Sequence, residues 1–286
     1  MNKINSYRIE KALTLVQGKL KGNLIHVHWW RGRKNFGDLV TKELFKHFKC
    51  TPIHAYDSNA QVIGAGSLLQ GIPKEFKGDI IGTGLIRNDG VLNRKNFAEC
   101  TINSVRGELT KNILSLPNSV PTGDLGLIAH KLLDRQNGNK KFTIGLIPHY
   151  VDKSSQWIDL IVNKFGKECL LIDVENSAHH VINEMQKCEI IISSSLHGII
   201  CADSLGIPNI WCELSDKVVG DGFKFHDYNT SINYEQNPYT TNELGDLKNI
   251  ERFISNKQIN IITEKQIEIE EIFSSSIQRL LSSSNE

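Results

Sequence analysis

One stretch of the chain combines residue types that can bind an anion and move a proton. It reads Ser-Ser-Ser-Leu-His-Gly at Ser193–Gly198 and directly follows the apolar run Ile190–Ile192. Such a run is typical of a buried parallel strand, and the apolar spacing after it predicts a helix. The first N–H groups of a helix lack backbone acceptors and lie at the positive end of its dipole, so this turn favours an anion.

His197 is the titratable residue of this turn and falls near the first turn of the predicted helix. Its imidazole titrates near neutral pH and can act as a general acid or base. We expect Ser195 and the N–H groups near Leu196 and Gly198 to bind oxygens of an anion. Local sequence supports equally well a capped helix start beside a structural histidine.

Three further candidates stand at strand ends or in a loop. Arg106 ends a predicted strand, where a guanidinium is either solvated or clamps a phosphate or carboxylate. His149 follows the predicted strand Phe142–Ile147, and Lys224 lies in the glycine-hinged segment 216–232. Because ligands of open α/β sheets gather at the carboxyl ends of strands, these side chains are expected to approach one site.

The spacing of apolar residues predicts the elements that carry these side chains. Helical spacing over Ser6–Leu20 is followed by a strand at Leu24–Trp30, a polar loop and a helix at Leu39–Phe48. Asp38 is the predicted N-cap of that helix. Similar strand–loop–helix units recur along the chain, which is typical of an α/β fold.

The predicted units form two successive groups, joined by a polar linker at residues 137–141. The sequence therefore predicts an α/β fold of two Rossmann-like domains facing across a cleft (GT-B-like), with C-terminal helices. The N-terminal Rossmann-like domain is residues 1–138, and the C-terminal one is residues 139–240. Residues 241–286 are helices that pack on the domains. Ligands of such folds bind between the domains.

The composition excludes several classes of protein. A formal net charge of +1 gives no strong field for nucleic acid. Six cysteines without a Cys-x-x-Cys pair indicate reduced thiols in the cytoplasm rather than disulfides or a zinc site. Charged residues interrupt the opening segment, so we expect no signal peptide. No apolar run approaches the ~20 residues of a transmembrane helix, which leaves a peripheral membrane contact open.

Short motifs follow one another in a fixed order along the chain. They are N-F-G-D at Asn35–Asp38, G-A-G at Gly64–Gly66, G-T-G at Gly82–Gly84, S-V-R-G-E-L-T at Ser104–Thr110, G-D-L-G-L-I at Gly123–Ile128, I-P-H at Ile147–His149, S-S-S-L-H-G at Ser193–Gly198, D-S-L-G-I-P at Asp203–Pro208 and G-D-G-F-K-F-H-D-Y at Gly220–Tyr228. No single motif is specific. As an ordered set over roughly residues 24–232, they resemble the polysaccharide pyruvyl transferase family.

The resemblance implies an activity. Members of the family transfer a group from phosphoenolpyruvate to two hydroxyls of a sugar, so that a cyclic pyruvate ketal forms and phosphate leaves. The acceptor is usually a sugar of a surface polysaccharide, often still carried on a polyprenyl diphosphate. No metal and no cofactor are implied, and phosphoenolpyruvate is the donor substrate. We expect a cytoplasmic location, which leaves open a place at the inner face of the cell membrane.

The resemblance also assigns roles to residues. Arg106 matches the family's arginine and is expected to clamp phosphate or carboxylate. His197 matches the motif histidine and is expected to be the acid and base. Lys224 is a second cation on the phosphoenolpyruvate side, formed by the C-terminal domain, and His149 would face the same cleft.

On the acceptor side, the N-terminal domain would bring Asn35 and Asp38 to the sugar. One departure matters: Ser195 stands where many relatives carry arginine, two residues before the motif histidine. Lys224, or an arginine at position 31 or 33, would have to supply that charge.

Two other functions fit the predicted architecture. A GT-B glycosyltransferase with a nucleotide-sugar donor is the first, although no acidic pair appears at a clear diphosphate–ribose spacing in the second domain. The second is a non-catalytic binding protein that keeps the fold. In all three cases Asp124 is interpreted as a turn or cap residue rather than a catalytic one.

Overall fold

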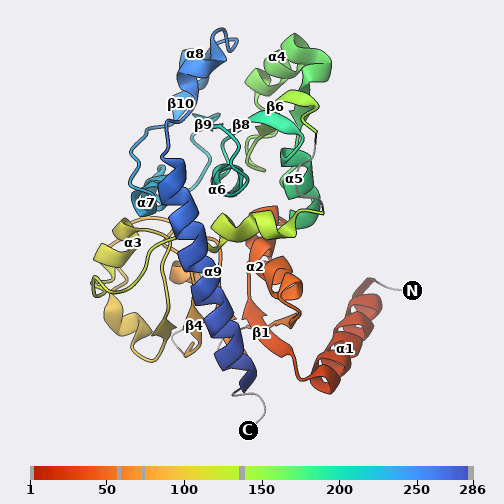
Figure 1. The fold of residues 1–286 in the computed structure, drawn as a ribbon, viewed down its shortest axis with the longest axis vertical. Coiled ribbons are helices and arrows are strands. Elements are labelled where there is room, and N and C mark those ends of the chain that lie inside the picture. Colours follow the sequence, from red (N-terminus) through yellow and green to blue (C-terminus); the bar gives the residue numbers. More distant parts are fainter. Residues whose placement is uncertain (1–2, 57–58, 73–74, 135–138, 283–286) are drawn as a thin grey trace.

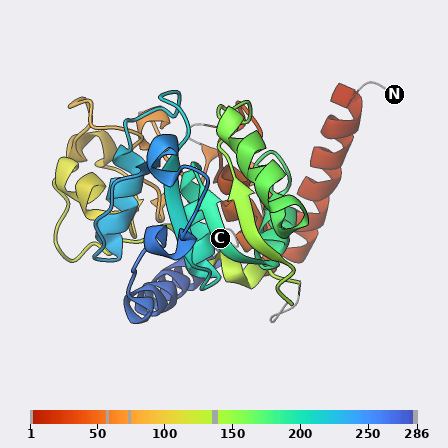
Figure 2. The same ribbon diagram turned by 90° about the horizontal axis from the view of Figure 1, so that it is seen from above.

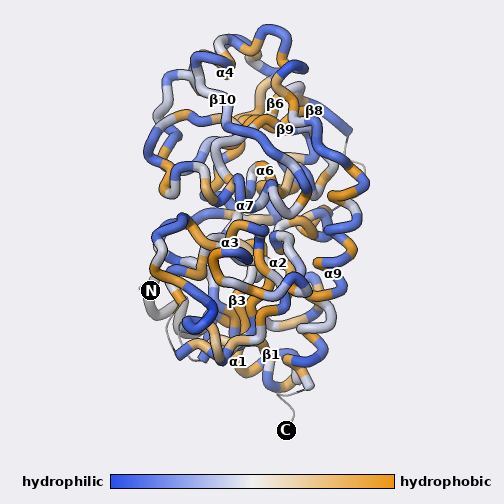
Figure 3. The backbone as a smooth tube through the Cα atoms, turned by 90° about the vertical axis from the view of Figure 1, so that its left-hand side faces the viewer, coloured by the Kyte–Doolittle hydropathy of each residue, from blue (hydrophilic) through white to orange (hydrophobic). Residues whose placement is uncertain are grey.

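The computed structural model describes residues 3–56, 59–72, 75–134 and 139–282, with side chains from residue 11 onward. It contains two parallel five-stranded sheets, ordered β2-β1-β3-β4-β5 and β10-β9-β8-β6-β7, each packed by helices (Figure 1). The predicted fold class, two Rossmann-like domains facing across a cleft, is confirmed. Figure 3 shows the hydrophobic segments concentrated along the central strands of each domain.

The strands of the first sheet are β1 (Leu24–His28), β2 (Thr51–His54), β3 (Val62–Ile63), β4 (Asp79–Ile80) and β5 (Thr101–Ile102). Those of the second are β6 (Phe142–Ile147), β7 (Cys169–Leu171), β8 (Cys188–Ser193), β9 (Asn209–Glu213) and β10 (Tyr239–Thr240). The α-helices are α1 (Lys3–Lys21), α2 (Phe36–His47), α3 (Glu108–Ile113), α4 (Gln156–Phe165), α5 (Ala178–Met185), α6 (Leu196–Ser204), α7 (Phe223–Ser231), α8 (Thr241–Leu244) and α9 (Ile259–Ser282). A 3-10 segment, η4 (Leu125–Leu132), precedes the second sheet.

The register of the second sheet brings its functional residues to one edge. Ile147 at the end of β6 lies beside Ser193 at the end of β8, and Ser193 lies beside Trp211 of β9. The apolar residues of β6 and β8 are buried because helices cover both faces of this parallel sheet. His149 and Ser195, two residues beyond these strand ends, therefore lie at the same edge.

The C-terminal helix α9 ties the two domains together. Figure 1 shows it running from the second domain along the side of the first. Phe273 packs against the rings of Phe45 and Phe48, with centroids 4.7 and 5.3 Å apart. Near the helix end, Arg279 pairs with Asp79 of β4. A continuous hydrophobic core thus spans both domains and α9.

Two predicted segments are only partly described. The predicted linker begins at Asn137 and Gly138, which lie outside the described residues, and the tail after Ser282 does so too. The predicted N-terminal helix is present as α1, which stands beside the body of the protein (Figure 2). Among the described helices, none is both long and apolar enough to cross a membrane.

Candidate functional site

A cavity of about 430 Å³ lies between the two domains. The titratable side chains of its lining lie near one another and form its polar end, and its wall in the first domain is rich in aromatic side chains. Most of the site residues that the sequence predicts line it: Asn35, Asp38, His149, Ser195, Leu196, His197 and Lys224. Residues from strand ends and helix starts of both domains thus meet at one place, as ligand sites of two-domain α/β proteins do.

The three serines before α6 fix the polar end of the cavity. Ser193 Oγ lies 2.8 Å from the carbonyl oxygen of Ile147 and accepts the N–H of Ser195. Ser194 Oγ donates to Asp152 at 2.6 Å and accepts the N–H of His149 at 2.9 Å. Ser193 and Ser194 therefore hold the turn in place. Ser195 is the N-cap residue of α6, but among the described residues its side chain makes no hydrogen bond to the helix, and the residue lines the cavity.

His197 lies in the first turn of α6 and is 4% exposed. Its Nε2 is 3.7 Å from Oδ1 of Asp124, and among the described residues neither Nε2 nor Asp124 Oδ2 has a hydrogen-bond partner. Asp124 Oδ1 also accepts the N–H of Gly126 at 2.7 Å, so the predicted cap is present. The oxygen that caps η4 is thus also the carboxylate oxygen that lies 3.7 Å from the imidazole.

A glycine of α2 lets the imidazole sit against the first domain. A Cβ at Gly37 would lie 2.2 Å from Nδ1 of His197, so only glycine allows this contact. The N-cap of α2 is Asn35, whose Oδ1 accepts the N–H of Gly37, and not Asp38 as predicted. Asp38 lies one turn further and lines the cavity, where burial raises its pKa to about 6 against the opposing charges of His197 and Lys224.

Lys224 and His149 complete the polar end. Burial, with help from Arg106, lowers the pKa of Lys224 to about 8, while Asp38 and Asp152 oppose this shift. The ammonium is therefore still charged at pH 7. Burial, and then the charges of Lys224 and Arg33, lower the pKa of His149 to about 4, so that this imidazole is neutral.

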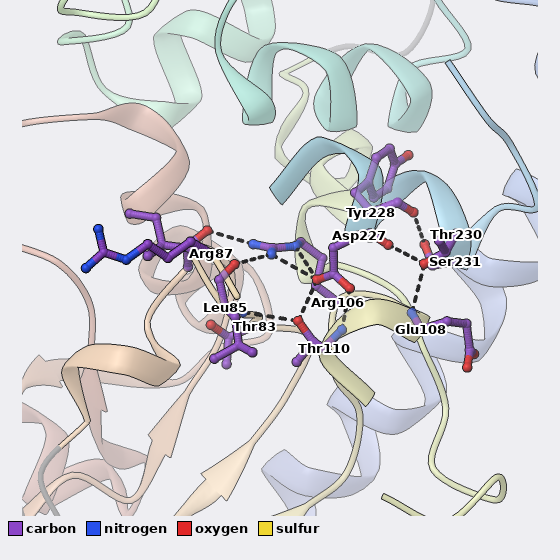
Figure 4. A network of polar contacts seen from close by, with 12 residues as sticks. Thr83, Leu85, Arg87, Arg106, Glu108, Thr110, Asp227, Tyr228, Thr230 and Ser231 are labelled. Carbon is purple, nitrogen blue, oxygen red and sulfur yellow. Dashed lines mark hydrogen bonds and ion pairs between the residues drawn. The ribbon is translucent and has the colours of Figure 1, made fainter. Parts of the chain in front are cut away.

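Arg106 lies outside the cavity lining, contrary to the expected position in the cleft. It is fully buried, and its Nε donates to Asp227 Oδ2 at 2.9 Å (Figure 4). Its Nη1 donates to Ser67 Oγ at 2.7 Å, and Nη2 donates to the carbonyl of Leu85. Asp227 also accepts the N–H of Thr110. The guanidinium therefore fastens α7, which carries Lys224, to the first domain.

The N–H of Gly198 is already engaged within α6, whereas it was expected to bind an anion. Its N–H donates to the carbonyl of Ser195 at 3.0 Å and is not directed at a ligand. A Cβ at this position would lie 2.1 Å from Ser193 Oγ. Glycine is required here so that α6 can pack against the serine turn. The N-cap Ser195 makes no side-chain cap bond within the described residues, so the first N–H groups of α6, at Leu196 and His197, are the ones expected to face an anion.

The sequence interpretation missed the aromatic wall and two buried carboxylates. Trp29, Trp30, Tyr56 and Tyr150 line the cavity. Trp29 and Trp30 directly follow β1, and their position at the carboxyl end of a strand could have predicted them as cavity residues. Asp152 and Asp227 gave no local signal, because their partners lie far away in sequence.

Two arginines were expected as substitutes for the charge absent at Ser195. Arg31 lines the cavity. Arg33 instead pairs with Glu175 at 2.9 Å and lies over the ring of Tyr150. Within the described ranges, no group of three or more His, Cys, Asp or Glu side chains is arranged to hold a metal ion.

Known proteins with similar sequences point to one family. A model of the polysaccharide pyruvyl transferase family matches residues 35–216. Protein L143 of Acanthamoeba polyphaga mimivirus, itself uncharacterized, is 30% identical over 75% of this chain and 77% of its own length. The succinoglycan biosynthesis protein ExoV of Rhizobium meliloti is 25% identical, and the match covers 74% of this chain and 66% of ExoV.

A solved structure of the wall teichoic acid polymerase TagF aligns with 100% of this chain and 98% of its own, at 10% identity and a TM-score of 0.45. That score is too low to add to the description of the fold. The family model, in contrast, spans more than half of the sequence and includes both Asn35 and His197. The chain belongs to the polysaccharide pyruvyl transferase family.

Proposed function

We propose that the protein transfers a pyruvyl group from phosphoenolpyruvate to two hydroxyls of a saccharide and forms a cyclic ketal. The acceptor would belong to a surface polysaccharide or its lipid-linked precursor. The observation that carries the proposal is the interdomain cavity, where Lys224 and the start of α6 meet His197 and Asp38. Membership of the family and the similarity to ExoV support it.

Donor binding follows from the positive groups at the polar end. Lys224 is charged at pH 7, and the first N–H groups of α6 are oriented for an anion. The neutral imidazole of His149 adds a polar contact without repelling the lysine. Phosphoenolpyruvate carries a phosphate and a carboxylate, which match a site with several separate donors. In this arrangement Lys224 supplies the positive charge that is missing because residue 195 is serine and not arginine.

We assign the proton transfers to two titratable groups that line the cavity, His197 and Asp38. His197 as imidazolium gives a proton to the methylene carbon of phosphoenolpyruvate, and C2 becomes oxocarbenium-like. The first sugar hydroxyl adds to C2 and gives its proton to Asp38. The C2–O bond to phosphate then breaks with its electron pair on phosphate, which takes the proton from Asp38. The second hydroxyl adds to C2 and returns a proton to His197, so all protons balance.

Asp124 has a supporting role in this scheme. Its carboxylate lies behind the imidazole on the Nε2 side and contacts neither the donor nor the acceptor. With the carboxylate 3.7 Å from Nε2 on one side and Gly37 packed against Nδ1 on the other, the ring is held in one orientation. Asp124 is therefore a positioning residue for His197.

Phosphate release tests the function directly. Incubation of the protein with phosphoenolpyruvate and a panel of glycosides, followed by phosphorus NMR, should show inorganic phosphate only when a suitable acceptor is present. The product should carry one pyruvate carbon bonded to two sugar oxygens in carbon NMR. If a UDP-sugar is consumed while phosphoenolpyruvate stays intact with every acceptor, the nucleotide-sugar glycosyltransferase replaces this proposal.

The pH dependence should show two separate changes, a rise in kcat near pH 6 and a loss of affinity for phosphoenolpyruvate near pH 8. Asp38 must be deprotonated to accept the hydroxyl proton, so kcat rises as pH increases through about 6. Lys224 must be protonated to hold the donor, so KM for phosphoenolpyruvate rises as pH increases through about 8.

Two variants assign these changes to residues. Lys224→Arg keeps the charge at every accessible pH, since guanidinium titrates above pH ~12, and should remove the rise in KM for phosphoenolpyruvate near pH 8. Asp38→Asn should remove the rise in kcat near pH 6 and lower the rate throughout. A rise in KM that stays near pH 8 in Lys224→Arg would show that another group is responsible.

A further inference from the structure

We propose that Trp30 and Tyr56 form a shelf at the wall of the cavity that binds the ring of the saccharide acceptor. This inference rests on the proposed function and adds to it the place where the acceptor lies. Phosphoenolpyruvate is far smaller than the drug-sized ligands that occupy cavities of ~300–1,000 Å³. A cavity of about 430 Å³ with a donor site at its polar end therefore has room for a second substrate.

The two side chains of this shelf are exposed although they are large and aromatic. Trp30 is 53% exposed and Tyr56 is 58% exposed, and both line the cavity. Large aromatic side chains usually bury most of their area, and exposed ones beside a cavity mark a place of ligand contact. Aromatic faces pack against the C–H face of a pyranose ring, while the hydroxyls at the ring's edge stay available for polar partners.

The topology of the first sheet brings the two residues to the same edge of the sheet. Strands β1 and β2 are parallel neighbours, with Val27 opposite His54. Tyr56 follows His54 by two residues and Trp30 follows Val27 by three, so both leave the sheet at its carboxyl edge and line the cavity there. The shelf therefore belongs to the first domain, opposite the α6 turn and Lys224 of the second.

Neighbouring rings hold the shelf in place before any ligand binds. Tyr56 packs edge-on against His28 and His54, with ring centroids 5.5 and 4.9 Å apart. His54 Nε2 lies 3.1 Å from the carbonyl oxygen of Trp29, and burial lowers the pKa of this histidine to about 4, which keeps it neutral. Tyr56 is thus backed by a neutral imidazole that is hydrogen-bonded to the backbone of Trp29.

Trp30 packs on a glycine of the following loop. A Cβ at Gly32 would lie 2.3 Å from the indole Cζ2, so the ring rests directly on the backbone of residue 32. One side of the indole is thus supported while half of it stays exposed. Prearranged aromatic faces of this kind lower the entropic cost of binding a ligand.

The test uses Trp30→Ala and Tyr56→Ala with the full chain. We expect KM for the acceptor glycoside to rise about ten-fold or more in each variant, with KM for phosphoenolpyruvate within two-fold of the original. Trp30→Phe should recover most of the affinity. Leu171→Ala, which removes an exposed side chain on β7 of the other domain, is the matched control and should change neither constant. Both shelf residues are over half exposed, so the melting temperature should hardly change.

A second readout separates this inference from the proposed function. Saturation-transfer NMR without phosphoenolpyruvate, with a panel of methyl glycosides and short oligosaccharides, should show contact between sugar C–H protons and the protein that Trp30→Ala weakens. Contact without any pyruvyl transfer would support the shelf and contradict the reaction. Transfer that is unaffected by both substitutions would overturn the shelf and leave the reaction standing. Loss of UDP binding instead of glycoside binding would assign the shelf to a nucleobase and overturn the inference.

Discussion

Replacing His197 with glutamine is expected to lower kcat by about 10²–10⁴, the usual contribution of a general acid or base. Glutamine keeps a polar side chain of similar reach but cannot donate a proton to the methylene carbon of the donor. The steady-state rate of phosphate release with saturating phosphoenolpyruvate and acceptor measures the loss. Deuterium incorporation into the methylene group of phosphoenolpyruvate in heavy water should disappear as well, because that exchange needs only the first proton transfer.

Stability measurements must accompany this variant because His197 is buried. A melting temperature within a few degrees of the original, together with unchanged binding of phosphoenolpyruvate, would assign the loss to chemistry. A large drop in the melting temperature with turnover retained would instead mean that His197 only fills its place beside Gly37 and Asp124.

Asp124→Asn is the matched variant for the histidine. An asparagine can still accept the N–H of Gly126 through its amide oxygen, so the cap of η4 is kept while the charge beside the imidazole is lost. We expect kcat to fall about ten-fold or more and both KM values to stay unchanged, because Asp124 orients the imidazole and contacts neither substrate. An unaltered kcat would restrict Asp124 to its capping role.

Local sequence was sufficient wherever the relevant partner lies close in the chain. The apolar run of β8 followed by Ser193–Gly198 predicts both the strand-to-helix turn and the presence of His197 in the site. The polar loop before α2 likewise predicts a helix start, although the cap is Asn35 rather than Asp38. Either side chain could fill that role from sequence alone, and the structure shows that Asp38 is left to line the cavity.

Long-range pairing was beyond the reach of sequence patterns. Arg106 ends a strand and matches a family motif, but its carboxylate partner lies 121 residues further along. Glycines 37 and 198 look like ordinary helix residues, and only the packed structure shows the atoms that a Cβ would meet. The aromatic shelf depends on the pairing of β1 with β2, which periodicity alone does not reveal.

The buried ion pair of Arg106 and Asp227 should dominate the stability of the junction between α7 and the first domain. Removing one partner by Arg106→Met or Asp227→Leu leaves the other charge buried and uncompensated. We expect each single variant to lose about 3–5 kcal/mol of unfolding free energy, measured by urea denaturation. The double variant should recover much of that loss, because neither charge then remains in the interior, and the resulting cycle gives the coupling between the two residues.

The same double variant decides whether Arg106 acts on the substrate or on Lys224. The guanidinium is fully buried and its donors are engaged by Asp227, Ser67 and Leu85, so in this arrangement none of them is directed at a substrate. We therefore expect the folded double variant to bind phosphoenolpyruvate within a few-fold of the original protein, because Lys224 remains in the cavity. If KM for phosphoenolpyruvate instead rises about 100-fold while the unfolding free energy recovers, Arg106 must rotate out to clamp the donor during the reaction. In that case the buried pair would be a resting state that substrate binding opens, and Asp227 would compete with the donor phosphate for the same guanidinium.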